Sequence, residues 1–542
     1  MKKRTLAALL SLALCCVSAG ALAKTETKYG LTISSDNGNW VFSEEAAPVS
    51  EGEGETLTFP PEGVLTITKA GTYTLSGSGK RVVINDVKGA VTLTLDGVTL
   101  EQTSSACMKI NNSAKTTLVL KGKNSMTGSA ATSATLENGT NPLEITCVGC
   151  GTAGHACGEL SVTNSRTISA VIGSAAGKPA GNITISGGIV SAENSSLYGA
   201  AIGSGQKGSV DGITISGGKI FAKANGGAAI GSGGTDIVGS ETNYAFAKNI
   251  TISGGDITGD TSGGEGAGIG SGAHSRASNI TISGGNLHIQ ANGGAGIGCG
   301  GTLSSEYQIT ASDITISGGS MDIGINHGAA IGSGALASAS SIRISGGEIN
   351  VTPSAGGSGA GIGSGWNGDV NGIVISGGNI DIQSRYGAGI GSGSGGNAKN
   401  ITISGGSIEA ESGIIGADGV GAGSSGTSEN IVIAPQNARI DASVSTTGFS
   451  SMTALEGSPF ISGSTDVTDQ VTGFRYFKTV GQYIPDPDED KDDPKDDPKD
   501  DPDKDILIVD MPKTGDGANL FLWTGLLALS GALYAAMKRR TA

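Results

Sequence analysis

Thiol and imidazole side chains gather in one short segment that contains Cys147, Cys150, His155 and Cys157. Thiolates and imidazoles are the ligands that tetrahedral zinc prefers, so these four residues form the candidate metal site of the chain. A disulfide between Cys157 and either Cys147 or Cys150 is a second possibility, and buried free thiols are a third. Because the surrounding sequence is strand-like and unlike that of established zinc knuckles, we predict no bound metal.

Acidic side chains are the second candidate for chemistry. Hydrolysis of a polysaccharide needs a pair of converging carboxylates, and elimination needs a base. Carboxylates recur near equivalent positions of a repeat, but their identity changes from copy to copy: Asp256, Asp322, Glu348, Asp381 and Glu409. The four histidines share no motif with them. We therefore predict no catalytic residues and expect that the chain is not an enzyme.

Aromatic side chains offer a binding surface in place of a catalytic site. Five of them lie in loops around one recurring motif: Tyr198, Tyr244, Tyr307, Trp366 and Tyr386. Aromatic faces are common in ligand sites and suit the stacking of sugar rings. If the loops align, these residues line one corner of the fold, and we predict that they bind glycan there.

The elements that would position these side chains come from two interleaved motifs, which account for many of the 94 glycines. The motif NITISGG or a close relative begins at isoleucines that recur about every thirty residues: Ile183, Ile213, Ile250, Ile280, Ile314, Ile342, Ile373, Ile401 and Ile431. The motif GA(A/G)IGSG centres on a second series: Ile172, Ile202, Ile230, Ile269, Ile297, Ile331, Ile362, Ile390 and Ile415.

Apolar residues within each unit alternate with a period of two, which indicates strands. Ile183 and Ile185 should face inward and Thr184 outward, and inward positions recur seven and nine residues after the first isoleucine. Three short strands with glycine corners make one rung, and Asn182 and its equivalents should occupy left-handed turn positions. We predict an all-β fold, a parallel and right-handed β-helix with rungs of about 28–31 residues.

The β-helix should extend beyond the clean repeat. Residues 55–165 form a strand-rich N-terminal region, residues 166–434 the repeat β-helix, and residues 435–484 a C-terminal cap that covers the exposed last rung. A β-propeller fits poorly because its blades are longer and carry aromatic signatures that this repeat lacks.

The segments Ala70-Gly-Thr-Tyr-Thr-Leu-Ser-Gly and Val91-Thr-Leu-Thr-Leu-Asp-Gly, together with the ITISGG repeats, resemble carbohydrate-binding β-helix proteins of clostridia, including a polygalacturonate-binding type. The resemblance spans roughly residues 55–480. It implies a pectate-lyase-like superhelix without lyase activity that binds acidic plant polysaccharide and calcium. Residues 266–271 read Gly-Ala-Gly-Ile-Gly-Ser where that family has Gly-Asp-Gly-Ile-Asp-Ser, so from the residues themselves we expect no cofactor.

The N-terminus has the pattern of a secretory signal peptide over residues 1–23. A basic start is followed by an apolar run and by Ala21-Leu22-Ala23, which suits a signal peptidase cutting between Ala23 and Lys24. We therefore expect an extracellular protein in which residues 24–54 form the mature N-terminal segment.

The C-terminus begins with an acidic, proline-rich spacer over residues 485–510, in which residues 486–505 hold twelve acidic side chains and four lysines, a net charge of -8. The motif Met511-Pro512-Lys513-Thr514-Gly515, an apolar anchor segment at 520–537 and a basic tail at 538–542 follow. This order resembles the LPxTG-type cell-wall sorting signal of Gram-positive surface proteins. The resemblance implies that a sortase cuts after Thr514 and joins Thr514 covalently to peptidoglycan.

The formal net charge of -15 gives no attraction to nucleic acid, which we exclude as a partner. The sequence thus predicts a non-catalytic protein, anchored to the cell wall, that binds polysaccharide or host glycan or acts as an adhesin. An envelope spacer without a ligand and a divergent polysaccharide lyase or hydrolase are the alternatives.

Overall fold

The computed structural model describes residues 55–60, 63–149, 157–165, 168–195, 197–236, 244–354, 356–413 and 417–434 with their side chains, and the backbone of further strands on either side. The chain divides into a small unit that ends at Gly54 and a large unit that begins at Glu55. In the small unit, β1 (Glu26–Lys28), β2 (Leu31–Asp36) and β3 (Asn39–Ser43) form an antiparallel sheet. The predicted signal peptide, spacer, sorting motif and anchor lie outside the described residues.

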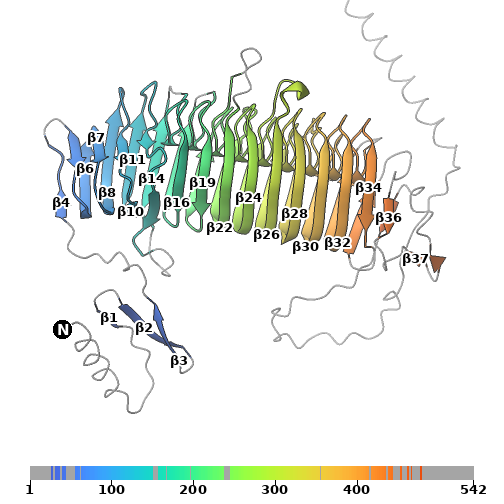
Figure 1. Cartoon of the computed structure of the whole chain (residues 1–542), viewed down its shortest axis with the longest axis horizontal. Helices are drawn as coiled ribbons and strands as arrows, with labels where there is room; N and C mark the ends of the chain where they lie inside the picture. Colours follow the sequence, from blue (N-terminus) through green and yellow to red (C-terminus); the bar gives the residue numbers. More distant parts are fainter. Residues whose placement is uncertain are drawn as a thin grey trace, which may run out of the picture. The chain divides into compact units, whose positions relative to one another are not determined.

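The large unit is a stack of parallel strands in sequence order (Figure 1). Its larger sheet is formed by β4 (Glu55–Leu57), β6 (Gly71–Gly79), β8 (Val91–Gln102), β10 (Thr116–Lys121), β11 (Lys123–Gly128), β13 (Leu143–Cys147), β14 (Glu159–Asn164), β16 (Ala180–Ile185), β17 (Ile189–Asn194), β19 (Val210–Ile215), β20 (Lys219–Lys223), β22 (Phe246–Thr261), β24 (Arg276–Ala291), β26 (Thr310–Ile325), β28 (Ser338–Pro353), β30 (Val370–Ser384), β32 (Ala398–Ser412), β34 (Ser428–Ile433), β35 (Ala438–Ser443), β36 (Met452–Ala454) and β39 (Tyr476–Lys478). All pairs are parallel except β35 with β39.

A second parallel sheet closes the other side of each rung. Its strands are short, and most consist of the Ile-Gly pair of the second motif: β5 (Val64–Ile67), β7 (Arg81–Asn85), β9 (Met108–Asn111), β12 (Leu136–Glu137), β15 (Ile172–Gly173), β18 (Ile202–Gly203), β21 (Ile230–Gly231), β23 (Ile269–Gly270), β25 (Ile297–Gly298), β27 (Ile331–Gly332), β29 (Ile362–Gly363), β31 (Ile390–Gly391) and β33 (Val420–Gly421). The parallel β-helix is thereby confirmed for the described residues.

The repeat register is confirmed residue by residue. Each first isoleucine pairs with the equivalent one of the next rung, as Ile183 does with Ile213 and Ile213 with Ile250. Side chains seven and nine positions later, such as Leu287 and Ile289, are fully buried in one continuous core. One assignment is wrong: Ile390 pairs with Val420 and not with Ile415, and Gly391 pairs with Gly421, so Val420-Gly421 takes the place of the Ile-Gly pair in this rung.

Two of the three predicted strands per rung are joined in the regular part. From β22 to β32 the Ser-Gly-Gly segment bends one long strand without ending it, and the pairing register shifts there, as between Ile252 and Asp256. Gly255 and its equivalents have a φ near +90°, which favours glycine.

The turn before each first isoleucine has the predicted left-handed conformation, with φ of 53° at Asn182 and 57° at Asn249. The amides also form a ladder: the Asn430 Nδ2 group donates to Asn400 Oδ1 at 2.6 Å, and the Asn400 Nδ2 group donates to Asn371 Oδ1 at 2.7 Å. These hydrogen bonds link successive rungs on the exposed surface.

A column of buried serines links the rungs internally. Ser333 Oγ donates to the Ala337 carbonyl at 2.7 Å and accepts from the Gly365 N–H of the next rung at 3.3 Å. Cys299 replaces serine in this column; it is fully buried, and burial raises the pKa of its thiol to about 12. Cys299 therefore packs in the hydrophobic core.

Asp418 caps the last strand of the second sheet, β33, with its side chain. In earlier rungs the N–H two residues after the motif isoleucine donates to the next rung, as Ser392 does to Gly421. In the last of these rungs the equivalent Ala422 N–H donates instead to Asp418 Oδ2 at 3.0 Å. Burial raises the pKa of Asp418 to about 6. Its carboxyl group thus takes the place of the missing carbonyl.

The stability of this end of the stack should depend on pH. Because the folded state raises the pKa of Asp418, its contribution is fully present below the unfolded pKa near 4 and is lost as pH rises through about 6. We expect a loss of about 2 kcal/mol in local opening free energy between pH 4.5 and 7.5. Hydrogen exchange of the Val420 and Ala422 amides measures it, and Asp418→Asn, which keeps an acceptor oxygen, should abolish the difference. An unchanged pH dependence in Asp418→Asn would contradict this assignment.

Within the predicted cap, β35 pairs in parallel with β32, and β37 (Ile461–Ser462) with β38 (Thr465–Asp466) forms a small antiparallel pair. A short 3₁₀ turn at Ser305–Tyr307 precedes β26. No helix in the described residues is long and apolar enough to cross a membrane.

Candidate functional site

The second motif forms a tight loop whose two flanks meet on the outer surface of the β-helix. One flank is the residue four positions after the motif isoleucine, and the other is the residue four positions before it. The backbone N–H of the first flank donates to the backbone carbonyl of the second flank in the preceding rung. Gly301 donates to Glu265 in this way at 2.8 Å, and Trp366 to His327 at 2.8 Å. Residues at these two positions therefore form a continuous edge along the stack.

Large side chains on this edge lie over glycines of the next rung. The Tyr198 ring covers Gly226 and Gly234, at which an added Cβ would lie 3.1 and 3.0 Å from Tyr198 Cδ1. The Glu265 carboxylate occupies the equivalent place over Gly293 and Gly301, where a Cβ would overlap it. Glycine at these positions therefore leaves room for a side chain to lie flat along the edge.

Three further side chains continue the edge toward the C-terminus. His327 and Trp366 are neighbours, with ring centroids 6.4 Å apart and planes inclined at 52°. Trp366 is 41% exposed and Tyr386 is 36% exposed, so both rings can contact a ligand. We call Tyr198, Glu265, His327, Trp366 and Tyr386 the edge strip. At about 4.8 Å per rung, its six rung spacings extend over about 30 Å.

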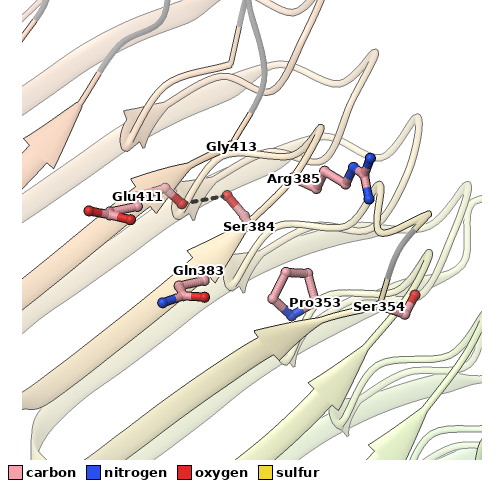
Figure 2. Close-up of a pocket in the computed structure, with 7 residues that line it drawn as sticks. All are labelled: Pro353, Ser354, Gln383, Ser384, Arg385, Glu411 and Gly413. Carbon is pink, nitrogen blue, oxygen red and sulfur yellow. Dashed lines mark hydrogen bonds between the residues drawn. The ribbon is translucent and has the colours of Figure 1, made fainter.

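A pocket of about 350 Å³ adjoins the strip at its C-terminal end. Its lining consists of Pro353, Ser354, Gln383, Ser384, Arg385, Glu411 and Gly413. Figure 2 shows Arg385 on one side of the pocket and Gln383 with Glu411 on the other, and the Ser384 hydroxyl donates to the Glu411 carbonyl at 3.0 Å. The Arg385 guanidinium carbon lies 5.8 Å from the centroid of the Tyr386 ring, so the pocket is continuous with the edge strip.

Of the five predicted glycan-binding residues, three lie on the edge. The other two do not occupy either of the two positions that form it. Tyr198, Trp366 and Tyr386 belong to the edge strip. Tyr244 and Tyr307 belong to the segments that lead into β22 and β26, and both pack partly against the core. The Arg276 guanidinium carbon lies 4.9 Å from the centroid of the Tyr244 ring.

The carboxylates considered for catalysis lie on the outer face of the larger sheet. Four of them, Asp322, Glu348, Asp381 and Glu409, are exposed. Asp256 is half-buried and pairs with Lys219 at 3.5 Å. Among the described residues, no group of three or more His, Cys, Asp and Glu side chains could hold a metal ion.

The cysteine segment is described in part. Cys147 is disulfide-bonded. Cys157 is not its partner in that bond, because the two sulfur atoms lie 3.0 Å apart, at hydrogen-bond distance, so the predicted Cys147–Cys157 disulfide is wrong. A sulfur in a disulfide is not a thiolate ligand. Cys150 and His155 lie outside the described residues, so the zinc hypothesis stays untested.

Sequence reasoning missed Glu265 and His327. Both occur four residues before a motif isoleucine, the same position as Tyr198 and Tyr386. An alignment of the rungs on that isoleucine would have placed all four residues on one line. The polar pair was overlooked because neither residue belongs to a repeated chemical pattern.

Comparison with protein families gives one match, to a β-helix repeat, at residues 183–206, 213–234, 280–301 and 373–394. The matched segments begin at first isoleucines and extend through the second motif, so they coincide with the rungs of the structure. No curated protein and no solved structure matches the chain significantly. Repeat pattern, parallel strand register and family match agree that these segments are β-helix repeats.

Proposed function

We propose that this β-helix binds carbohydrate without catalysis and that the edge strip is its binding surface. The observation that carries the proposal is the alignment of Tyr198, Trp366 and Tyr386 on one edge, where glycines of neighbouring rungs leave the surface flat. Aromatic faces with a few convergent polar groups are typical of small-ligand sites. A strip about 30 Å long suits an extended glycan chain better than a single small molecule.

The pocket beside Tyr386 supports the same function. Gln383, Arg385 and Glu411 offer amide, guanidinium and carboxylate groups, which together can donate to and accept from hydroxyl groups. A ring that stacks on Tyr386 would place its hydroxyls near this pocket. The pocket therefore supplies hydrogen bonds that the aromatic rings lack.

A glycan array probed with the full secreted chain tests the proposal. Binding to at least one polysaccharide class, reduced in a variant with Tyr198, Trp366 and Tyr386 replaced by Ala, would support it. Absence of binding to every glycan on the array would favour the alternative, an envelope spacer without a ligand. Turnover of a bound polysaccharide would favour the divergent lyase or hydrolase.

We further propose that the protein is displayed on a Gram-positive cell wall. The order of a signal peptide, an acidic spacer, Met511-Pro512-Lys513-Thr514-Gly515, an apolar segment and a basic tail supports this location. The twenty-residue acidic part of the spacer, residues 486–505, could extend over about 60 Å because its charges repel one another. The binding edge would then stand clear of the wall surface.

Replacement of Thr514 tests the anchoring. If a sortase joins Thr514 to peptidoglycan, Thr514→Ala should leave less than about a tenth of the protein in the covalently bound wall fraction, because the acyl-transfer site is lost. Immunoblots of wall, membrane and medium fractions measure this, and Thr479→Ala, outside the motif, is the matched control. Wall retention of Thr514→Ala equal to that of the native chain would contradict the proposal.

A further inference from the structure

In the middle of the edge strip, the Glu265 carboxylate and His327 Nδ1 have no hydrogen-bond partner among the residues that the structure describes. The Glu265 side chain is half-buried, and its carboxylate forms no hydrogen bond or ion pair with any residue that the structure describes. His327 Nδ1 is buried and likewise has no hydrogen-bond partner within the described part of the chain. The two side chains flank the same turn: the Glu265 carboxylate lies against Gly293, and the His327 backbone N–H donates to the carbonyl of the adjacent Asn292 at 2.8 Å. Burial raises the pKa of Glu265, and His327 opposes that rise.

Unpartnered polar groups destabilise the free protein. A buried donor or acceptor without a hydrogen bond costs about 1–3 kcal/mol, and an ionised group costs more. Most such groups in folded proteins are satisfied, and exceptions point to a ligand, water or ion. Gly293 and Gly301 have no Cβ, so the Glu265 carboxylate lies flat against their backbone on the edge strip.

The third member of the cluster is Trp366, whose ring lies beside His327. A carboxylate that accepts, an imidazole that donates or accepts, and an exposed indole face together match a ring that carries hydroxyl groups. We propose that Glu265, His327 and Trp366 form a subsite for a neutral sugar ring and that Glu265 excludes uronic acids. The inference rests on the proposed glycan-binding function and names the class of sugar.

Charge decides between neutral and acidic sugars. A uronate at this subsite would bring a second carboxylate close to Glu265, and like charges in a poorly solvated place repel strongly. Hydroxyl groups would instead donate charge-assisted hydrogen bonds to Glu265, which are stronger than bonds between neutral groups.

Length-matched oligosaccharides test the inference with the full secreted chain. Calorimetric titrations compare neutral glucan, galactan, xylan and mannan oligomers with oligogalacturonate, for the native chain, Glu265→Gln and the control Glu193→Gln on the outer face of β17. We expect the native chain to prefer a neutral oligomer at least tenfold. Glu265→Gln should reduce that preference about tenfold, because the amide is a weaker acceptor and carries no charge. Glu193→Gln should keep the preference.

The outcomes separate the two proposals. Preference of the native chain for oligogalacturonate would overturn the inference, and so would a preference that stays within twofold in Glu265→Gln while binding persists. Failure of the native chain to bind any oligomer would contradict the glycan-binding function itself. Thermal unfolding of each variant, with a midpoint equal to that of the native chain, confirms that affinity changes do not arise from unfolding. If Glu265→Gln unfolds, His327→Gln replaces it and should weaken binding of the neutral oligomer about tenfold.

Discussion

Gly332→Ala is expected to lower the free energy of unfolding by about 3 kcal/mol. Gly332 has a φ of +138°, which L residues rarely adopt, and a Cβ there would overlap the carbonyl oxygen of Gly363 in the next rung. Neither atom can move without breaking the backbone hydrogen bonds of the short sheet, because Ser333 N–H donates to that same Gly363 carbonyl. Denaturant unfolding followed by circular dichroism measures the loss.

Gly356→Ala is the matched control for this experiment. Gly356 is exposed, its φ is not in the left-handed region, and a Cβ would meet only Asn326 Oδ1 at an ordinary 3.5 Å. The same chemical change should therefore alter stability by less than about 1 kcal/mol. Equal stability of the Gly332 and Gly356 variants would contradict the close stacking of rungs through the second motif.

Trp366→Ala should weaken glycan binding about thirtyfold, which corresponds to about 2 kcal/mol. Trp366 is the largest exposed ring on the edge strip, and it lies between the polar groups of His327 and the Tyr386 end. Truncation removes the stacking face and leaves the strand pairing intact, since only the Trp366 backbone bonds to His327. Isothermal titration with the best glycan from the array measures the change.

Phe221→Ala is the control for the loss of an exposed aromatic ring. Phe221 is 38% exposed, similar to Trp366, but it lies on the outer face of β20 and not on the edge. Its replacement should leave affinity within twofold of the native value. If both variants bind equally well, the glycan does not contact the edge strip.

The register of the β-helix was predictable because an isoleucine recurs at the same position of each rung. The spacing of Ile183, Ile213 and Ile250 predicts pairs that the structure contains, although the intervals include insertions. Period-two alternation also predicts which of Ile183, Thr184 and Ile185 face inward. The pairing of Val420 was not predicted, because a valine occupies the isoleucine position there and the preceding segment also contains an Ile-Gly pair.

The candidate site was only partly predictable, because the sequence does not show where the second motif reverses direction. The loop brings the residue four positions after its isoleucine to the residue four positions before the isoleucine of the preceding rung, so Trp366 contacts His327 of the adjacent rung. Sequence distance alone groups Tyr307 with the other loop aromatics, yet that ring packs partly against the core. Glu265 belongs to no recognisable sequence motif. Only the position of its carboxylate over Gly293 and Gly301 distinguishes it from other surface carboxylates.

Hydroxyl-radical footprinting of the full chain, with and without saturating glycan, tests the central claim most directly. Radicals oxidise exposed aromatic rings, and mass spectrometry reports each ring separately. The edge-strip account predicts protection of Trp366 and Tyr386 by the glycan and unchanged oxidation of Phe221 on the sheet face. Oxidation of Trp366 and Tyr386 that is equal with and without bound glycan would contradict it.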